Sequence, residues 1–196
     1  MENIKIGLVI MASGLGKRYG GNKLMENLND KPLIKWIIDA TEGIFERRIV
    51  VTRNSEVKAL CDSINIECIK HELPNRNDTV RLGLSAIGMD VDYCFFTPGD
   101  QPLITNESIV KLINAAVDNK DRIVRTSYGD IVGSPMGFPK AFFKELLELP
   151  EGKGGSFVAK SHQAAVYGVE VQNECELWDI DTVADMEMIK NMLKQM

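Results

Sequence analysis

The segment VIMASGLGKRYGGNKL (residues 9–24) passes from an apolar run directly into a glycine-rich stretch that carries three basic residues. A glycine-rich turn after a strand is a common outline of a phosphate-binding loop, because main-chain N–H groups can approach an anion there. Between residues 3 and 25 the chain has four basic residues and no acidic one. The segment therefore predicts a small anionic ligand.

The P-loop pattern fits this segment poorly. It requires GxxxxGK followed by Ser or Thr, whose hydroxyl binds magnesium. The Gly-Lys pair of the segment, Gly16-Lys17, is followed by Arg18, so that hydroxyl is missing. We expect Lys17 to remain solvated.

The Rossmann pattern GxGxxG also fits incompletely. Gly14 and Gly16 match its first two glycines, but Gly20 comes one residue late. The acidic residue expected after the second strand is replaced by Arg53, which could hold the 2′-phosphate of NADP. An NADP site and a plain solvated turn thus stay open as alternatives at this point.

Length and composition set the class of protein. The 196 residues fit one domain (residues 1–196) with a sizeable core, and 44% of them are hydrophobic. A net charge of −5 argues against general nucleic-acid binding. No apolar run reaches membrane length, no signal-peptide cleavage site is recognisable, and the four cysteines lack CxxC spacing. We expect a cytoplasmic protein that binds neither nucleic acid nor membrane.

The chain alternates strand-like and helix-like segments. The expected strands are residues 4–11, 48–52, 65–69, 93–97, 122–126 and 164–169, with an irregular strand in the segment YGDIVGSPMGF. The expected helices are residues 32–42, 55–63, 78–87, 107–117, 140–147, 156–161 and 183–193. This alternation predicts an α/β fold with a mostly parallel sheet covered by helices on both faces. Ligands of such sheets bind beyond the carboxyl ends of the strands, where the glycine-rich loop, PNRNDT (74–79) and GDQP (99–102) all lie.

The glycine-rich loop reads Ala-Ser-Gly-x-Gly-x-Arg (residues 12–18), with Lys23 following. It resembles the signature of the molybdenum cofactor nucleotidyltransferase family, which has the MobA-like NTP transferase fold. The resemblance implies a three-layer α/β/α sandwich with a mixed, mostly parallel sheet, a Rossmann-like nucleotide-diphospho-sugar transferase fold. It further implies nucleotide binding by Ala12, Ser13, Gly14, Gly16, Arg18 and Lys23. Arg18 and Lys23 would also be catalytic, because cations neutralise the triphosphate and stabilise charge during phosphoryl transfer.

Two further loops extend the resemblance. Asp100 in GDQP matches the family's Asp-x-Pro, whose aspartate is catalytic and binds Mg²⁺ that bridges the nucleotide phosphates. Taken alone, GDQP is more readily interpreted as a turn, and it is the glycine-rich loop that favours the metal-binding interpretation. Thr79 matches the Ser or Thr that opens the family's third helix near the base or ribose, whereas Asp78 or Asn77 is expected to cap that helix. The glycine usual in this loop is missing, since ELPNRN stands there.

Near the C-terminus, WDIDTVADM carries Asp179 and Asp181, which an extended segment would project to the same side. Thr182 with Asp185 is close to a capping box. The segment resembles the Asp-Ile-Asp-Thr motif of molybdenum cofactor cytidylyltransferases. That resemblance implies a second metal or substrate contact at Asp181, while the role of Asp179 stays open.

The segments GSPMGF and GKGGS resemble acceptor-side segments of the family, although packing explains Phe138 equally well. His71 and His162 match no motif and are expected to be structural or exposed.

The resemblance implies an Mg²⁺-dependent nucleotidyltransferase that moves CMP from CTP to molybdopterin and releases pyrophosphate, with a molybdoenzyme as the recipient of the product. The alternatives are GTP as the nucleotide, or a sugar or polyol phosphate of the methylerythritol- or ribitol-phosphate type as the acceptor. A non-catalytic carrier of nucleotide or cofactor is the alternative from another class of protein.

Overall fold

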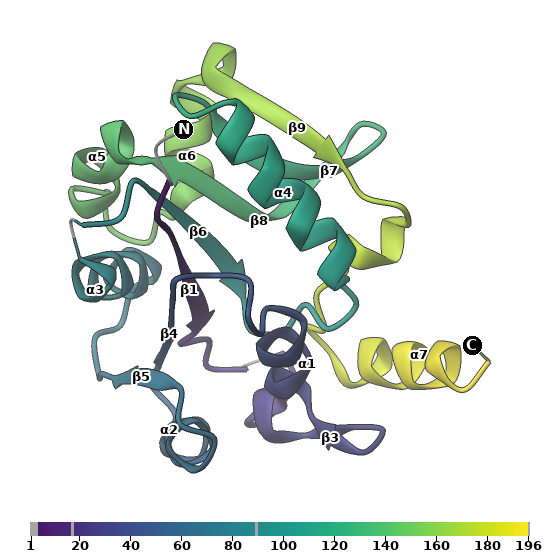
Figure 1. Ribbon diagram of the computed structural model, residues 1–196. Helices are drawn as coiled ribbons and strands as arrows, with labels where there is room; N and C mark the ends of the chain where they lie inside the picture. Colours follow the sequence, from purple (N-terminus) through teal and green to yellow (C-terminus); the bar gives the residue numbers. More distant parts are fainter. Residues whose placement is uncertain (1–3, 17, 89, 196) are drawn as a thin grey trace.

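The computed structural model describes residues 4–16, 18–88 and 90–195. Figure 1 shows a central twisted sheet with helices on both of its faces. The strands are β1 (Ile6–Ala12), β2 (Asn27–Leu28), β3 (Lys31–Pro32), β4 (Arg47–Thr52), β5 (Glu67–Lys70), β6 (Tyr93–Pro98), β7 (Ile123–Tyr128), β8 (Ile131–Pro139) and β9 (Val166–Glu170). The α-helices are α1 (Leu33–Ala40), α2 (Ser55–Ser63), α3 (Arg76–Ile87), α4 (Asn106–Asp118), α5 (Phe143–Leu147), α6 (Gly155–Ser161) and α7 (Val183–Leu193). Short 3₁₀ turns are η1 (Lys23–Met25), η2 (Lys140–Phe142), η3 (Gln163–Ala165) and η4 (Glu174–Leu177).

The large sheet has seven strands in the order β5-β4-β1-β6-β8-β7-β9. Strands β5, β4, β1 and β6 are mutually parallel, and β7 pairs with β9 in parallel. Strand β8 runs antiparallel to both of its neighbours. The predicted α/β fold with a mixed, mostly parallel sheet is therefore confirmed. Because β1, β4, β5 and β6 are parallel, their carboxyl ends meet at one edge of the sheet.

The two faces of the sheet bury separate cores, as expected when alternate side chains of a strand point to opposite faces. Leu8 and Ile10 of β1 pack with apolar residues of α1, α2, α4 and α7. Val9, between them, packs with residues of α3, α5 and α6. This arrangement confirms the three layers. Strand β1, covered on both sides, accordingly reads as a continuous apolar run.

Helix α3 begins earlier than the sequence indicated, and this corrects the expected cap. Its N-cap is Asn75, and Asp78 lies at the third helical position, where its carboxylate accepts the N–H of Asn75 at 3.1 Å. The helix packs tightly on the sheet, because a Cβ at Gly83 would lie 2.4 Å from a methyl carbon of Val9. Asn77 does not cap; its side chain accepts the N–H of Gly152 at 2.9 Å.

Strand β8 is longer and more regular than the sequence indicated. It spans nine residues despite two glycines and two prolines. A Cβ at Gly137 would lie 2.4 Å from the ring of Tyr93, so the glycine makes room for aromatic packing. Phe138 is fully buried in the core, which corrects the idea that it faces an acceptor.

The small ribbon of β2 and β3 was not expected, since each strand has two residues.

Lys17, expected to be solvated, lies outside the described residues. Within the described part of the chain, none of the helices has the length and apolar character needed to cross a bilayer.

Candidate functional site

A cleft of about 390 Å³ opens at the carboxyl ends of the parallel strands. Its walls come from five segments that are far apart in the sequence: the glycine-rich loop after β1, Arg53 after β4, the loop before α3, the end of β6 and the segment before α7. The lining includes Ser13, Arg18, Thr79, Asp100, Asp179 and Asp181. The three loops that the sequence analysis singled out therefore meet in one place.

Main-chain geometry shapes the glycine-rich loop. Gly16 has φ +58°, and a Cβ there would lie 2.1 Å from the carbonyl oxygen of Gly21, so a larger residue cannot make this turn. The carbonyl of Gly16 accepts the N–H groups of Tyr19 and Gly20 at 3.0 and 2.9 Å. Gly14 lines the cleft, and the space where its Cβ would stand is open. Gly16 thus forms the turn, and Gly14 leaves room for a ligand.

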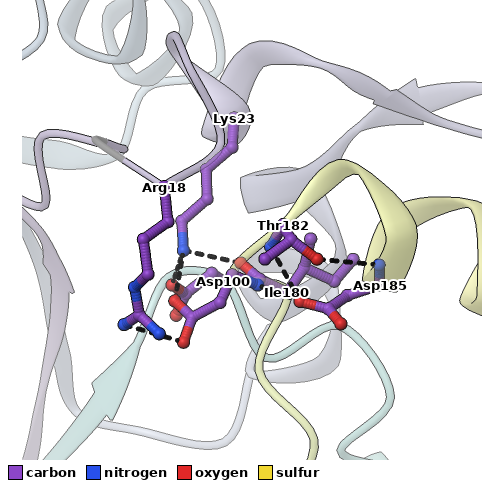
Figure 2. A network of polar contacts seen from close by, with 7 residues as sticks. Arg18, Lys23, Asp100, Ile180, Thr182 and Asp185 are labelled. Atoms are coloured by element: carbon purple, nitrogen blue, oxygen red, sulfur yellow. Dashed lines mark hydrogen bonds and ion pairs between the residues drawn. The ribbon is translucent and has the colours of Figure 1, made fainter.

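Lys23 is held at the centre of a polar network (Figure 2). Its ammonium lies 2.5 Å from a carboxylate oxygen of Asp100 and 3.2 Å from one of Asp181, and it donates to the carbonyl of Ile180 at 2.6 Å. Only 10% of the Lys23 side chain is exposed. Burial on its own would lower the pKa of Lys23, but the charges and hydrogen bonds of Asp100 and Asp181 outweigh it and raise that pKa. Lys23 is therefore a fixed positive charge.

The segment that carries Asp181 is fastened at both sides. The N–H of Ile180 donates to the carbonyl of Asp100 at 3.0 Å, which ties the segment to the end of β6. On the other side, Asp185 accepts the N–H groups of Asp181 and Thr182 at 2.9 and 2.7 Å, and the Thr182 hydroxyl accepts the N–H of Asp185 at 3.2 Å. The capping box between Thr182 and Asp185 is confirmed (Figure 2), and it leaves the carboxylate of Asp181 free to contact Lys23.

Arg18 approaches the same carboxylate from the glycine-rich loop. Its guanidinium lies 3.0 Å from Asp181, and 75% of its side chain is exposed. An exposed pair of this kind adds little stability. Because Arg18 also lines the cleft, it is free to exchange Asp181 for an anionic ligand.

Asp179 lies in the cleft beside the other two carboxylates. The cleft walls exclude much of the bulk water around it, and the charges of Asp100 and Asp181 add to that effect. Together they raise the pKa of Asp179 to about 7, against the opposing charges of Lys23 and Arg76. Three carboxylates, those of Asp100, Asp179 and Asp181, therefore lie together on this side of the cleft.

These carboxylates raise the question of whether the residues of the cleft fit a divalent cation. Carboxylate oxygens are the ligands that hard cations such as Mg²⁺ prefer. No group of three or more His, Cys, Asp or Glu side chains within the described residues is arranged to hold a metal by itself. Asp100 and Asp181 therefore fit as a partial shell, to be completed by oxygens of a bound ligand.

The remaining predicted residues lie at different depths. Thr79 lines the cleft from the first turn of α3 and is buried. Ala12 is buried at the end of β1, and its carbonyl accepts the hydroxyl of Thr52 at 3.0 Å. Gly16 and Lys23 border a smaller neighbouring cavity of about 130 Å³. Ser13 and Gly14 thus face the cleft directly, whereas Ala12 supports them from behind.

The sequence analysis gave no role in this loop to Arg53 or His71. The guanidinium of Arg53 donates to the carbonyl of Ser13 at 2.8 Å. Nε2 of His71 lies 2.8 Å from the hydroxyl of Ser13. Both residues directly follow a parallel strand, β4 and β5, and that position is the signal in the sequence that could have identified them.

Residues 8–166 match the family model of the MobA-like NTP transferase domain. The chain is 30% identical over 122 residues to 2-C-methyl-D-erythritol 4-phosphate cytidylyltransferase of Endomicrobium trichonymphae, covering 60% of this chain and 56% of that protein. It is 26% identical over 127 residues to a probable molybdenum cofactor guanylyltransferase of Natranaerobius thermophilus, covering 61% and 58%. The chain thus spans about half the length of these curated relatives.

Among solved structures, Rv0371c of Mycobacterium tuberculosis H37Rv superposes with a TM-score of 0.85 at 23% identity, covering 96% of this chain and 99% of that one. The same protein has been solved in complex with manganese, with a TM-score of 0.75 at 20% identity over 95% and 98% of the two chains. At such identities the likeness concerns the fold.

Proposed function

The chain belongs to the MobA-like NTP transferase domain family, and from this premise we propose that residues 1–196 form a single nucleotidyltransferase domain. The reaction moves a nucleoside monophosphate from a nucleoside triphosphate to a phosphorylated acceptor and releases pyrophosphate. One observation carries this proposal: the buried ammonium of Lys23 is fixed between Asp100 and Asp181, two carboxylates that line the cleft together with Arg18. Two cations and two carboxylates at one cleft are the groups that such a transfer requires.

The chemistry follows from these charges. An oxygen of the acceptor phosphate attacks the α-phosphorus in line, its bond to phosphorus forms, and the bond to the pyrophosphate oxygen breaks. Negative charge builds on the non-bridging oxygens and on the leaving pyrophosphate. Lys23, already held in place, stabilises that charge without reorganisation, and Arg18 can bind phosphate oxygens with two N–H groups. No nucleophile from the protein takes part.

A divalent cation, which we propose to be Mg²⁺, would be held by Asp100 and Asp181 together with phosphate oxygens of the nucleotide. When bound, it neutralises phosphate charge and orients the triphosphate. Both carboxylates line the cleft from different segments, and both contact the ammonium of Lys23, which supports this assignment.

For the finer identity of the substrates we propose CTP as the nucleotide and molybdopterin as the acceptor. Two features support this choice. The pair Ala12-Ser13 resembles the Ala-Ala pair of cytidylyl enzymes, and residues 179–182 carry the Asp-Ile-Asp-Thr motif of molybdenum cofactor cytidylyltransferases. The base and ribose would lie at the end of the cleft formed by Ser13, Gly14 and Thr79. A molybdoenzyme would then receive the product.

A second candidate is cytidylyl transfer to a polyol phosphate such as methylerythritol phosphate. The 30% identity to a curated enzyme of that name favours it. Guanylyl transfer to molybdopterin is a third, favoured by the 26% identity to a probable guanylyltransferase. All three share the same transfer step and differ in the base and the acceptor.

Pyrophosphate release tests the proposal. The chain is supplied with Mg²⁺ and either CTP or GTP, in parallel with molybdopterin, methylerythritol phosphate, ribitol phosphate or a sugar phosphate. We expect release with CTP and molybdopterin. Release with polyol or sugar phosphates alone would overturn the cofactor assignment but not the transfer step.

A non-catalytic carrier would give a different result. It would be protected against thermal unfolding by nucleotide or molybdopterin yet release no pyrophosphate with any acceptor. Protection by NADPH but not by CTP or GTP would instead indicate the dinucleotide site that Gly14, Gly16 and Arg53 left open.

A further inference from the structure

His71 connects two walls of the cleft. It directly follows β5, and its main-chain N–H donates to the carbonyl of Thr52 at 3.0 Å, which continues the sheet pairing by one residue. From there its ring reaches the glycine-rich loop, where Nε2 lies 2.8 Å from the hydroxyl oxygen of Ser13. The two residues are 58 positions apart in the sequence. The imidazole is half-buried.

The neighbours of the ring define its tautomer. The N–H of Leu73 donates to Nδ1 of His71 at 3.2 Å, so Nδ1 carries no proton. In the neutral ring the proton is then on Nε2, which donates to the Ser13 hydroxyl. That hydroxyl in turn donates to the carbonyl of Val51 at 3.1 Å. The chain of hydrogen bonds runs in one direction and uses both ring nitrogens.

One consequence concerns Ser13. Its hydroxyl accepts from His71 and donates to Val51, so its proton is already used. The side chain of Ser13 therefore anchors the loop, and a ligand in the cleft meets the main chain of Ser13 and the open side of Gly14.

Arg53 makes a second link between the same two loops. Its Nε donates to the carbonyl of Ser13 at 2.8 Å. Its Nη1 lies 3.4 Å from the carbonyl oxygens of Leu73 and Pro74. The loop at residues 13–14 and the loop at residues 73–75 are thus joined twice, and Ser13, Gly14, Pro74 and Asn75 line the cleft between them.

We propose that His71, together with Arg53, is a positioning residue that fixes the spacing of these two loops and thereby sets the affinity for the nucleotide. The inference rests on the proposed function. His71 does not touch the group of Lys23, Asp100 and Asp181, so its loss should weaken nucleotide binding and leave the transfer step nearly unchanged. A side chain that fixed only the fold would not separate these two quantities.

The charged groups around His71 define the pH range of this role. Burial and the charge of Arg53 lower the pKa of His71, whereas Asp78 of α3 and Glu72 beside it act in the opposite direction. The neutral ring, which accepts from Leu73, therefore persists at neutral and mildly acidic pH. Protonation places an N–H on Nδ1 against the N–H of Leu73, and the link to the second loop is then lost.

The test compares four variants in the pyrophosphate-release assay. His71→Ala should raise the KM for the nucleotide about tenfold, the scale expected when a partly buried hydrogen-bond partner is removed, with kcat within about twofold of wild type. His71→Gln keeps an N–H donor at the reach of Nε2 and should restore most of the affinity. His71→Asn is too short to reach Ser13 and should not. His162→Gln is the matched control, because His162 is a half-exposed histidine paired with Glu145 at 2.9 Å outside the cleft.

Two further measurements complete the test. Ser13→Ala combined with His71→Ala should cost little more than His71→Ala alone, since the two side chains act through one hydrogen bond. The KM of the wild type should rise more steeply than that of His71→Gln as the pH falls below the ordinary histidine range of about 6.5. Both follow from the proposed link.

If folded His71→Ala keeps the KM of the wild type, the inference is overturned. A fall of about tenfold in kcat with KM unaltered would overturn it as well. Far-UV circular dichroism and the unfolding midpoint identify a variant that has lost its fold, and His71→Gln then carries the test through its pH profile. Failure of the proposed function looks different, because the wild type itself would then release no pyrophosphate with any nucleotide.

Discussion

The two ends of the cleft are built from different interactions. At one end, Lys23 and Arg18 face Asp100 and Asp181, and full charges lie 2.5–3.2 Å apart. At the other end, the imidazole of His71 bonds the hydroxyl of Ser13, which donates to the carbonyl of Val51, and the guanidinium of Arg53 bonds main-chain carbonyls rather than a carboxylate. Fixed charges stabilise the charge that develops on the reacting groups during a transfer. Directional hydrogen bonds instead hold the loops of a binding site in one geometry. The contrast suggests that the charged end sets the rate of transfer and the hydrogen-bonded end sets the affinity for the nucleotide.

The strongest way to break this contrast is Asp100→Asn. We expect kcat for pyrophosphate release to fall about 100-fold or more, because the change removes the negative charge that would hold the divalent cation and that fixes the ammonium of Lys23. The fold should persist, since Lys23 keeps Asp181 and the carbonyl of Ile180 as partners. Asp121→Asn, an exposed carboxylate at the opposite end of the sheet, is the matched control. Equal kcat in Asp100→Asn and wild type would remove Asp100 from the transfer.

Arg18→Ala sharpens the same end of the comparison. We expect kcat to fall about tenfold, because one of the two cations near the phosphates is lost. The unfolding midpoint should stay within about 2 °C, since an exposed ion pair contributes little to stability. Arg47→Ala removes an ion pair with Glu67 at the start of β4 and serves as the control. If both arginine variants keep full kcat, Arg18 is a surface residue only.

Glu176→Gln changes a buried carboxylate that does not line the cleft and should have the smallest effect on kcat. The buried carboxylate of Glu176 accepts the N–H and hydroxyl of Thr105 at 3.1 and 2.9 Å and the N–H of Gln172 at 3.1 Å. Burial opposes ionisation, but hydrogen bonds from Ser108, Thr105 and Asn173 outweigh it and lower the pKa of Glu176. An amide group would face these donors with N–H groups of its own and should cost about 1–3 kcal/mol at pH 7.

The sign of its pH dependence follows. A lowered folded-state pKa gives stability that is present above the ordinary glutamate value of 4.5 and is lost as the pH falls through the folded-state value. The gap in unfolding midpoint between wild type and Glu176→Gln should therefore narrow in acid. Glu174→Gln, exposed in the same turn, should show no gap. A gap that stays constant down to pH 3 would contradict the role of the charge.

Much of the charged end could be predicted from the sequence. Lys23 and Asp100 follow two neighbouring parallel strands, and strand-end residues of such sheets converge at one edge. Asp181 was identified by its motif, although the contact of its neighbour Ile180 with both Lys23 and Asp100 was not.

The hydrogen-bonded end could not be predicted in the same way. The contact of His71 with Ser13 depends on how the ends of β5 and β1 lie across β4, and no local pattern encodes that distance. Strand β8 gives a similar lesson. Gly137 weakens strand propensity locally, yet the rings of Tyr93 and Phe95 need the space that it leaves.

The most direct test of the division between the two ends is the rate of pyrophosphate release as a function of nucleotide concentration, measured side by side for Asp100→Asn and His71→Ala. The account predicts that Asp100→Asn lowers the plateau with little change in the half-saturating concentration, whereas His71→Ala shifts the half-saturating concentration about tenfold and keeps the plateau. The account would be contradicted if both variants changed the plateau alone, or if both changed the half-saturating nucleotide concentration alone.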